Sequence, residues 1–176
     1  MRAIRVHPCV SAAVIGGLVS VVALVAQAPP GDLRHETAHL VATVVPVATP
    51  VAPGARVSLR LDVAPKPKMH VYSPEQKDYI PISLTLDPDP SFKAHPVVFP
   101  RAERFYFQAL DETQPVFSKP FRITQDITLA AIASARARAA GGTLSVKGTL
   151  RYQACDDAVC YRPETVAVTW HLTLKP

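Results

Sequence analysis

Apolar and polar residues alternate along much of this chain, and this period-two pattern is the strongest constraint on its fold. Side chains at every second position of a β-strand lie on one face, so the pattern is typical of strands with one buried face. Proline, at 18 of 176 residues, interrupts long helices and argues against a helical bundle. The apolar positions are Val57, Leu59, Leu61 and Val63; Ile80, Ile82, Leu84 and Leu86; Phe121, Ile123, Ile127 and Leu129, with Gln125 breaking the series; Leu144, Val146, Leu150 and Tyr152; and Val166, Val168, Trp170, Leu172 and Leu174.

Turn-forming residues separate these segments. They include Pro53-Gly54, Asp87 to Pro90 and Gly141-Gly142. Strands at this spacing predict an antiparallel β-sandwich, with residues 29–176 as one domain and 45–54 as an interior loop. Residues 128–140 fit either a short helix or a strand end followed by a loop, and the sequence leaves both open.

Residues 1–28 have the pattern of a secretory signal peptide. Arg2 and Arg5 precede an apolar run from Cys9 to Ala26, and Ala26-Gln27-Ala28 resembles a cleavage site. The apolar run approaches the length that spans a bilayer, so an uncleaved N-terminal anchor is the alternative, and it is the only membrane contact that we expect. We favour cleavage, which leaves two cysteines in an oxidising compartment where disulfides persist.

These two cysteines, Cys155 and Cys160, lie between two strand-like segments. We expect a hairpin with one cysteine near each inner end. Opposed Cα atoms in paired strands are about 4.5–5.5 Å apart, which suits a disulfide. The carboxylates of Asp156 and Asp157 should raise the pKa of a nearby cysteine, because a like charge disfavours the thiolate.

The role of this bridge is open on spacing alone. A ring this short contributes about 2 kcal/mol in the chain-entropy model, which is little for a structural staple. A tight bridge at a hairpin tip is also within reach of an attacking thiolate. The alternatives are a redox disulfide and a secreted binding or structural domain whose bridge is static.

Three sequence motifs resemble the N-terminal periplasmic domain of the DsbD thiol:disulfide interchange family. The first is Tyr152-Gln153-Ala154-Cys155, followed by Cys160-Tyr161 and Pro163-Glu164-Thr165. The second is Lys68-Met69-His70-Val71-Tyr72, and the third is Glu103-Arg104-Phe105-Tyr106. The resemblance extends from about residue 35 to 174.

The resemblance implies an immunoglobulin-like β-sandwich with a reversible disulfide and no bound cofactor or metal. In the family, this disulfide accepts electrons from a membrane-embedded domain and passes them to thioredoxin-like periplasmic proteins. The chain would then be a periplasmic protein-disulfide reductase module, and its membrane electron donor would be a separate protein. Cys160 would attack the partner and Cys155 would resolve the mixed disulfide.

The resemblance also implies a cap loop over the disulfide, formed by Glu103-Arg104-Phe105-Tyr106. Phe105, with Tyr106, would cover the disulfide and move away when a partner docks, while His70 and Tyr72 would line the site. The segment departs from the family pattern at the start of the cap, where Glu103 retains one acid and Arg104 replaces the second. The cysteines are also separated by one residue fewer than in well-known members. The replacement at Arg104 weakens the transfer of a proton-handling role to the acidic pair of the cap.

Other motifs favour competing functions less strongly. His35-Glu36-Thr37-Ala38-His39 matches H-E-x-x-H, but zinc catalysis needs a helix, and the β-branched residues that follow predict a first strand. Met69 and His70 with the cysteines suggest soft-metal binding, although a strand beside a loop explains them as well. The net charge is +5 without a Lys/Arg run, which argues against nucleic-acid binding. Trp170 fits the core face of the last strand.

Overall fold

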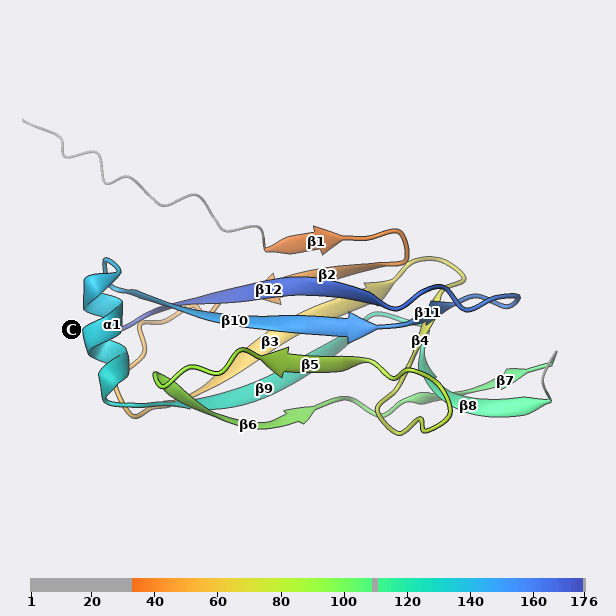
Figure 1. Ribbon diagram of the computed structural model, residues 1–176, viewed down its shortest axis with the longest axis horizontal. Helices are drawn as coiled ribbons and strands as arrows, with labels where there is room; N and C mark the ends of the chain where they lie inside the picture. Colours follow the sequence, from red (N-terminus) through yellow and green to blue (C-terminus); the bar gives the residue numbers. More distant parts are fainter. Residues whose placement is uncertain (1–32, 109–110, 176) are drawn as a thin grey trace, which may run out of the picture.

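The computed structural model describes residues 33–108 and 111–175, and the predicted signal segment 1–28 lies outside them. Figure 1 shows an elongated molecule in which α1 lies at one end and the β7–β8 hairpin at the other. The elements are β1 (Arg34–Glu36), β2 (Leu40–Val45), β3 (Arg56–Pro65), β4 (His70–Tyr72), β5 (Ser83–Leu86), β6 (Phe92–Val98), β7 (Glu103–Phe107), β8 (Glu112–Phe117), β9 (Phe121–Leu129), α1 (Ile132–Ala139), β10 (Thr143–Tyr152), β11 (Ala154–Cys155) and β12 (Glu164–Thr173).

Two antiparallel sheets form the predicted immunoglobulin-like sandwich. One has the strand order β1-β2-β3-β9-β6 and the other β12-β10-β5. The alternating residues point inward from both sheets into one core, which confirms the all-β prediction. Trp170 is 1% exposed in this core, and its indole N–H donates to the carbonyl of Arg60 at 3.0 Å, which satisfies its polar atom.

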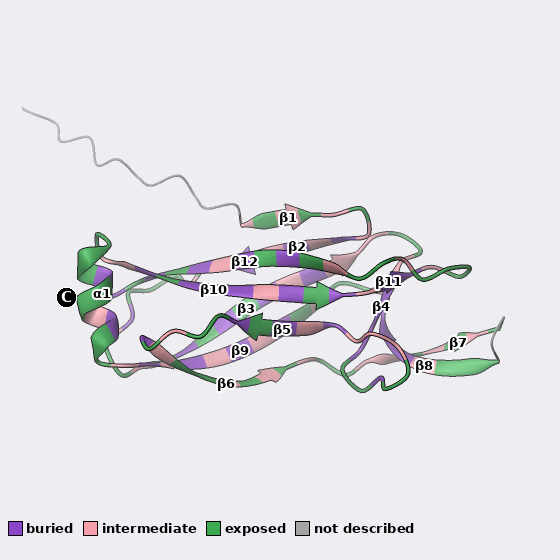
Figure 2. Ribbon diagram, in the orientation of Figure 1, coloured by how far each residue is buried: buried purple, intermediate pink, exposed green. Residues whose placement is uncertain are grey.

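The third sheet, with the order β11-β4-β8-β7, lies at the end of the sandwich opposite α1 (Figure 1). Val71, Phe117 and Ala154 place one of its faces on the main core. Its other face carries a separate cluster that contains Tyr72, Val116 and Cys155. Figure 2 shows buried residues along β4, whereas the projecting β7–β8 hairpin is more exposed. This sheet therefore connects the core to the cysteine pair.

The two breaks in the alternating pattern have physical causes. Gln125 is 6% exposed, and its amide donates to the carbonyl of His95, where the register of β6 shifts between Ala94 and Val97. Gly148 stands at an inward position of β10, and a Cβ there would lie 2.9 Å from the carbonyl oxygen of Thr85. Gln125 therefore supplies a hydrogen bond to a backbone carbonyl at the bulge in β6. Gly148 has no side chain, which allows β5 to lie close to β10.

Several boundaries differ from the sequence prediction. Ile80 lies in the loop before β5, so the strand that was expected to include it begins only at Ser83. Residues 128–140 contain the short helix and not the loop alternative, because β9 ends at Leu129 and α1 spans Ile132–Ala139. Ala133 and Ala137 pack against the core, since small side chains at i and i+4 let the helix lie close to the sheets. Among the described residues, no helix is long and apolar enough to cross a membrane.

Core packing can be tested with the same substitution at two sites. Val63 is 0% exposed in β3, whereas Val98 is 62% exposed in β6. We expect Val63→Ala to lower the free energy of unfolding by about 2 kcal/mol, because it removes two buried methyl groups and leaves a cavity. Val98→Ala should cost less than about 1 kcal/mol. Urea denaturation of the oxidised full chain measures both values, and equal losses would contradict this description of the core.

Candidate functional site

The two cysteines face each other across a narrow hairpin that follows β10. Cys155 ends β11 and pairs with Cys160 in an antiparallel bridge. The Tyr161 N–H donates to Ala154 O, and the Asp156 N–H donates to Val159 O. These bonds lie on either side of the cysteines, which makes them a non-hydrogen-bonded pair, the kind whose Cα atoms approach most closely. Their Cα atoms are 4.0 Å apart, slightly closer than predicted, and the sulfurs form a disulfide.

Asp156 holds the loop between the cysteines in shape. Its Oδ1 accepts hydrogen bonds from the backbone N–H groups of Ala158 and Val159, each at 2.8 Å. Its Oδ2 accepts a hydrogen bond from the Tyr161 hydroxyl at 2.8 Å. The backbone donors from Val159 and Ala158 and then Tyr161 hold the pKa of Asp156 below its usual value. The loop therefore carries an anchored carboxylate directly beside Cys155.

The two cysteines differ in exposure. Cys155 is 1% exposed and packs in the cluster with Tyr72 and Val116. Cys160 is exposed, as are the loop residues Ala158 and Val159 that precede it. An incoming thiolate therefore meets Cys160 first.

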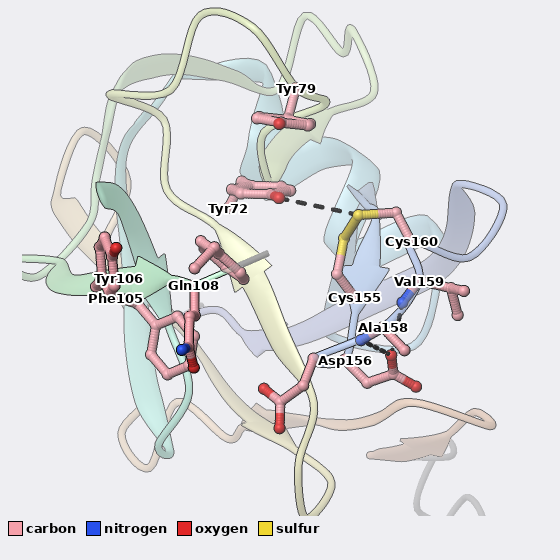
Figure 3. Close-up of a pocket in the computed structure, with 12 residues that line it drawn as sticks. Tyr72, Tyr79, Phe105, Tyr106, Gln108, Cys155, Asp156, Ala158, Val159 and Cys160 are labelled. Carbon is pink, nitrogen blue, oxygen red and sulfur yellow. Dashed lines mark hydrogen bonds between the residues drawn. A yellow bond between two sulfur atoms is a disulfide. The ribbon is translucent and has the colours of Figure 1, made fainter. Parts of the chain in front are cut away.

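Tyr72 lies beside the disulfide on β4. Its hydroxyl is 3.9 Å from Cys160 Sγ, and because a disulfide sulfur has no proton, the hydroxyl is the donor (Figure 3). Its ring stacks on Tyr79 with centroids 4.6 Å apart. Burial, with smaller effects of Tyr79 and Glu112, raises the pKa of Tyr72 to about 12. The hydroxyl therefore keeps its proton at neutral pH and is able to donate to a thiolate at Cys160.

His70 lies behind the pocket wall. It is 3% exposed, and its ring is within 5.6 Å of the Phe105 centroid and 4.9 Å of the Phe107 centroid. Its Nε2 is buried and has no hydrogen-bond partner among the described residues. Burial lowers the pKa of His70, and the Asp157 and Asp156 carboxylates oppose this shift. His70 is therefore a neutral, buried imidazole at neutral pH.

A pocket of about 690 Å³ separates the cysteine loop from the β7–β8 hairpin (Figure 3). Aromatic side chains form one wall and the cysteine loop forms the other. Val159 and Tyr106, each 54% exposed, are large hydrophobic residues at its rim. The lining residues are Tyr72, Tyr79, Phe105, Tyr106, Phe107, Gln108, Cys155, Asp156, Asp157, Ala158, Val159 and Cys160. The site therefore offers an apolar recess with a disulfide in its wall.

The cap residues lie on a strand and not on the expected loop. Phe105 and Phe107 share the face of β7 that contacts His70, whereas Tyr106 has the opposite parity and donates its hydroxyl to Asp111 at 2.8 Å. Glu103 begins β7 and does not line the pocket. Its carboxylate accepts hydrogen bonds from Ser118 at 3.2 Å and Lys119 at 3.1 Å.

Sequence reasoning missed several residues at the site. Tyr79 stacks on Tyr72 from a loop, where no periodic pattern indicates a contact. Phe107 lies one residue beyond the cap motif, and Tyr161 entered the sequence analysis only as part of the cysteine motif. The alternation of β7 could have assigned Phe107 to the Phe105 face. The signal for Asp156 was its position after a cysteine in a short loop, where Asp side chains accept nearby backbone N–H groups.

The H-E-x-x-H residues do not form a helix. His35 and Glu36 lie in β1, which ends at Glu36, three positions earlier than a strand through His39 requires. The Thr37 hydroxyl accepts the backbone N–H groups of His39 and Leu40 and turns the chain. His39 Nδ1 lies 2.6 Å from Glu164 Oε1. The spacing that would place two histidines on one helical face is therefore not realised.

The chain is similar in sequence to a known protein family over most of its length. The sequence model described as "Thiol:disulfide interchange protein DsbD, N-terminal" matches residues 39–171. Among solved structures, the chain is similar to the reduced DsbD N-terminal domain of Neisseria meningitidis, with 16% sequence identity and a TM-score of 0.44. This match covers 68% of this chain and 86% of the Neisseria chain. The N-terminal periplasmic domain of ScsB from Proteus mirabilis is 15% identical with a TM-score of 0.49, over 78% of this chain and 47% of that chain. No curated protein sequence shows a significant match.

The family match includes β4, the β7–β8 hairpin and the complete cysteine loop. It therefore includes every element that builds the pocket. The chain belongs to the family of N-terminal domains of the thiol:disulfide interchange protein DsbD, a family of thiol–disulfide exchange modules.

Proposed function

We propose that this chain is a periplasmic thiol–disulfide exchange module that carries two electrons on Cys155 and Cys160. The observation that carries the proposal is the asymmetry of the disulfide. Cys160 is exposed at an apolar pocket, whereas Cys155 is 1% exposed beneath it. A bridge that only stabilised the fold would need no pocket beside it.

The difference in exposure supports one order of attack in the exchange reaction. A donor thiolate attacks Cys160 Sγ, the bond between the two sulfurs breaks, and Cys155 leaves as a thiolate that takes up a proton. A second donor thiol then attacks the donor's sulfur in this mixed disulfide, which releases Cys160 and leaves both cysteines reduced. In the outgoing reaction, Cys160 attacks the partner's disulfide and Cys155 resolves the mixed disulfide. The Tyr72 hydroxyl, 3.9 Å from Cys160 Sγ, stabilises a thiolate at Cys160 in both directions.

Family membership supports a thioredoxin-like protein as the electron acceptor and a separate membrane protein as the donor. Both belong to this proposal, as do export by residues 1–28 and a mature domain of residues 29–176. Phe105 would serve as the movable part of the cap, since it packs on His70 and lines the pocket opposite the disulfide. The static binding domain remains the competing function and predicts a bridge that never cycles.

Cysteine trapping tests the order of the two cysteines. In the full chain with Cys9→Ser, we expect Cys155→Ser to accumulate mixed disulfides through Cys160 in cells, because no resolving thiol remains. Mass spectrometry should identify the linked proteins as thioredoxin-like, joined through their own active-site cysteine.

Cys160→Ser is the matched control and should trap far less, since Cys155 is buried. Equal trapping by both variants would contradict the order. A wild-type pair that resists alkylation completely in cells would support the static domain instead.

Shielding by the cap can be tested on one strand. We expect Phe105→Ala to accelerate reduction of the disulfide by dithiothreitol several-fold, because the variant removes a ring from the pocket that faces Cys160. Arg104→Ala is the control, since this side chain has the opposite parity on β7, is exposed and does not line the pocket. Stopped-flow measurement of thiol oxidation gives both rates. If the two variants react alike, Phe105 is not the shield.

A further inference from the structure

His70, Cys155 and Cys160 stand in a row across three neighbouring segments of chain. Cys155 is directly opposite His70 in the β11–β4 ladder and directly opposite Cys160 in the hairpin bridge. Residues directly opposite each other in antiparallel strands point to the same face, with Cβ atoms about 4.5–5.5 Å apart. His70 is therefore the cross-strand neighbour of Cys155 on the side away from Cys160.

Cys155 needs a proton acceptor when it resolves a mixed disulfide. The thiolate is the nucleophile in this step, so the thiol must first lose its proton. Cys155 is 1% exposed and packs among aromatic side chains, with the Asp156 carboxylate in the next residue. Burial and a neighbouring negative charge both disfavour the thiolate. Bulk water also has little access to this sulfur.

His70 has the properties of such an acceptor. Within residues 33–108 and 111–175, its buried Nε2 has no hydrogen-bond partner, which is costly for a polar atom unless the atom has a function. The ring is held by contacts to Tyr72, Phe105 and Phe107. Burial lowers the pKa of His70, so its imidazole is neutral and able to accept a proton at neutral pH.

The other titratable groups that face His70 are less suited to this role. From the cysteine loop, Asp156 is hydrogen-bonded by three donors and Asp157 is exposed. On β4, the pKa of Tyr72 is about 12, so its hydroxyl stays protonated. On β7, Glu103 accepts hydrogen bonds from Ser118 and Lys119. The Glu103 carboxylate is therefore already hydrogen-bonded to residues other than His70.

We propose that His70 is the general base that activates Cys155. His70 takes the proton from Cys155 Sγ, and this sulfur forms a bond with Cys160 Sγ. The bond between Cys160 Sγ and the partner's sulfur breaks, and the partner's sulfur leaves with the electron pair as a thiolate. The imidazolium then passes its proton to that thiolate or to water. This inference rests on the proposed function, because it assigns the resolving role to Cys155.

The resolving step can be observed without the natural partner. The reduced full chain with Cys9→Ser is mixed in stopped flow with dithiobis-nitrobenzoate, a disulfide that releases a coloured thiolate. Attack by Cys160 releases the first equivalent and resolution by Cys155 releases the second.

We expect His70→Phe to slow the second release roughly 100-fold at pH 7, the lower end of general-base effects, and to leave the first unchanged. In the wild type, the second rate should level off above the pKa of His70. In the variant, it should rise about tenfold per pH unit with the thiolate fraction.

His171→Phe is the matched control, because His171 is an exposed histidine on β12. His70→Gln keeps a polar side chain without a base and should reproduce the loss, which covers the case in which His70→Phe does not fold. Unchanged second rates in both variants, or a wild-type rate that rises with hydroxide throughout the neutral range, would overturn the proposal. A very negative reduction potential would instead refute the exchange function and leave the His70 effect intact, so the two failures are distinguishable.

Discussion

The pairing of β11 with β4 connects the cysteine pair to the fold, and the rest of the site depends on it. Because side chains alternate along these strands, Val71 and Ala154 enter the main core while His70 and Cys155 point to the opposite face. A shift of one residue in this register would exchange the two sets. The hydrophobic free energy of the core thereby also holds the cysteine pair in place. Asp156 completes the arrangement, since its carboxylate shapes the loop that presents Cys160.

Most of the sandwich could be predicted because its strands each bury one face. Residues such as Leu59, Leu61 and Val63 alternate with polar residues, and all three are fully buried. The exceptions depend on contacts between distant segments. Gln125 is explained only by a bulge in β6, and Gly148 only by the close approach of β5. Ile80 continues an alternating pattern but lies in a loop, since periodicity alone does not locate the end of a strand.

The cysteine pair could be predicted from spacing, whereas its surroundings depended on family motifs or were missed. The hairpin and the disulfide follow from two cysteines between strand-like segments. The stacking of Tyr79 on Tyr72, 4.6 Å between centroids, joins a loop to a strand and has no local sequence signal. The cap segment was expected as a loop but forms β7, because its run of aromatics lies in a strand paired with β8. In a strand, successive side chains point to opposite faces, so Tyr106 and Phe105 lie on different faces of β7. A loop would not impose this alternation.

The reduction potential of Cys155–Cys160 tests the central claim most directly. Equilibration of the oxidised full chain, with Cys9→Ser, against glutathione and dithiothreitol buffers gives the value. A carrier that exchanges electrons with thioredoxin-like partners should fall between roughly −180 and −270 mV, the range of known exchange proteins. A value below about −300 mV is typical of structural disulfides and would contradict the account. It would leave the chain as a binding domain with a static bridge.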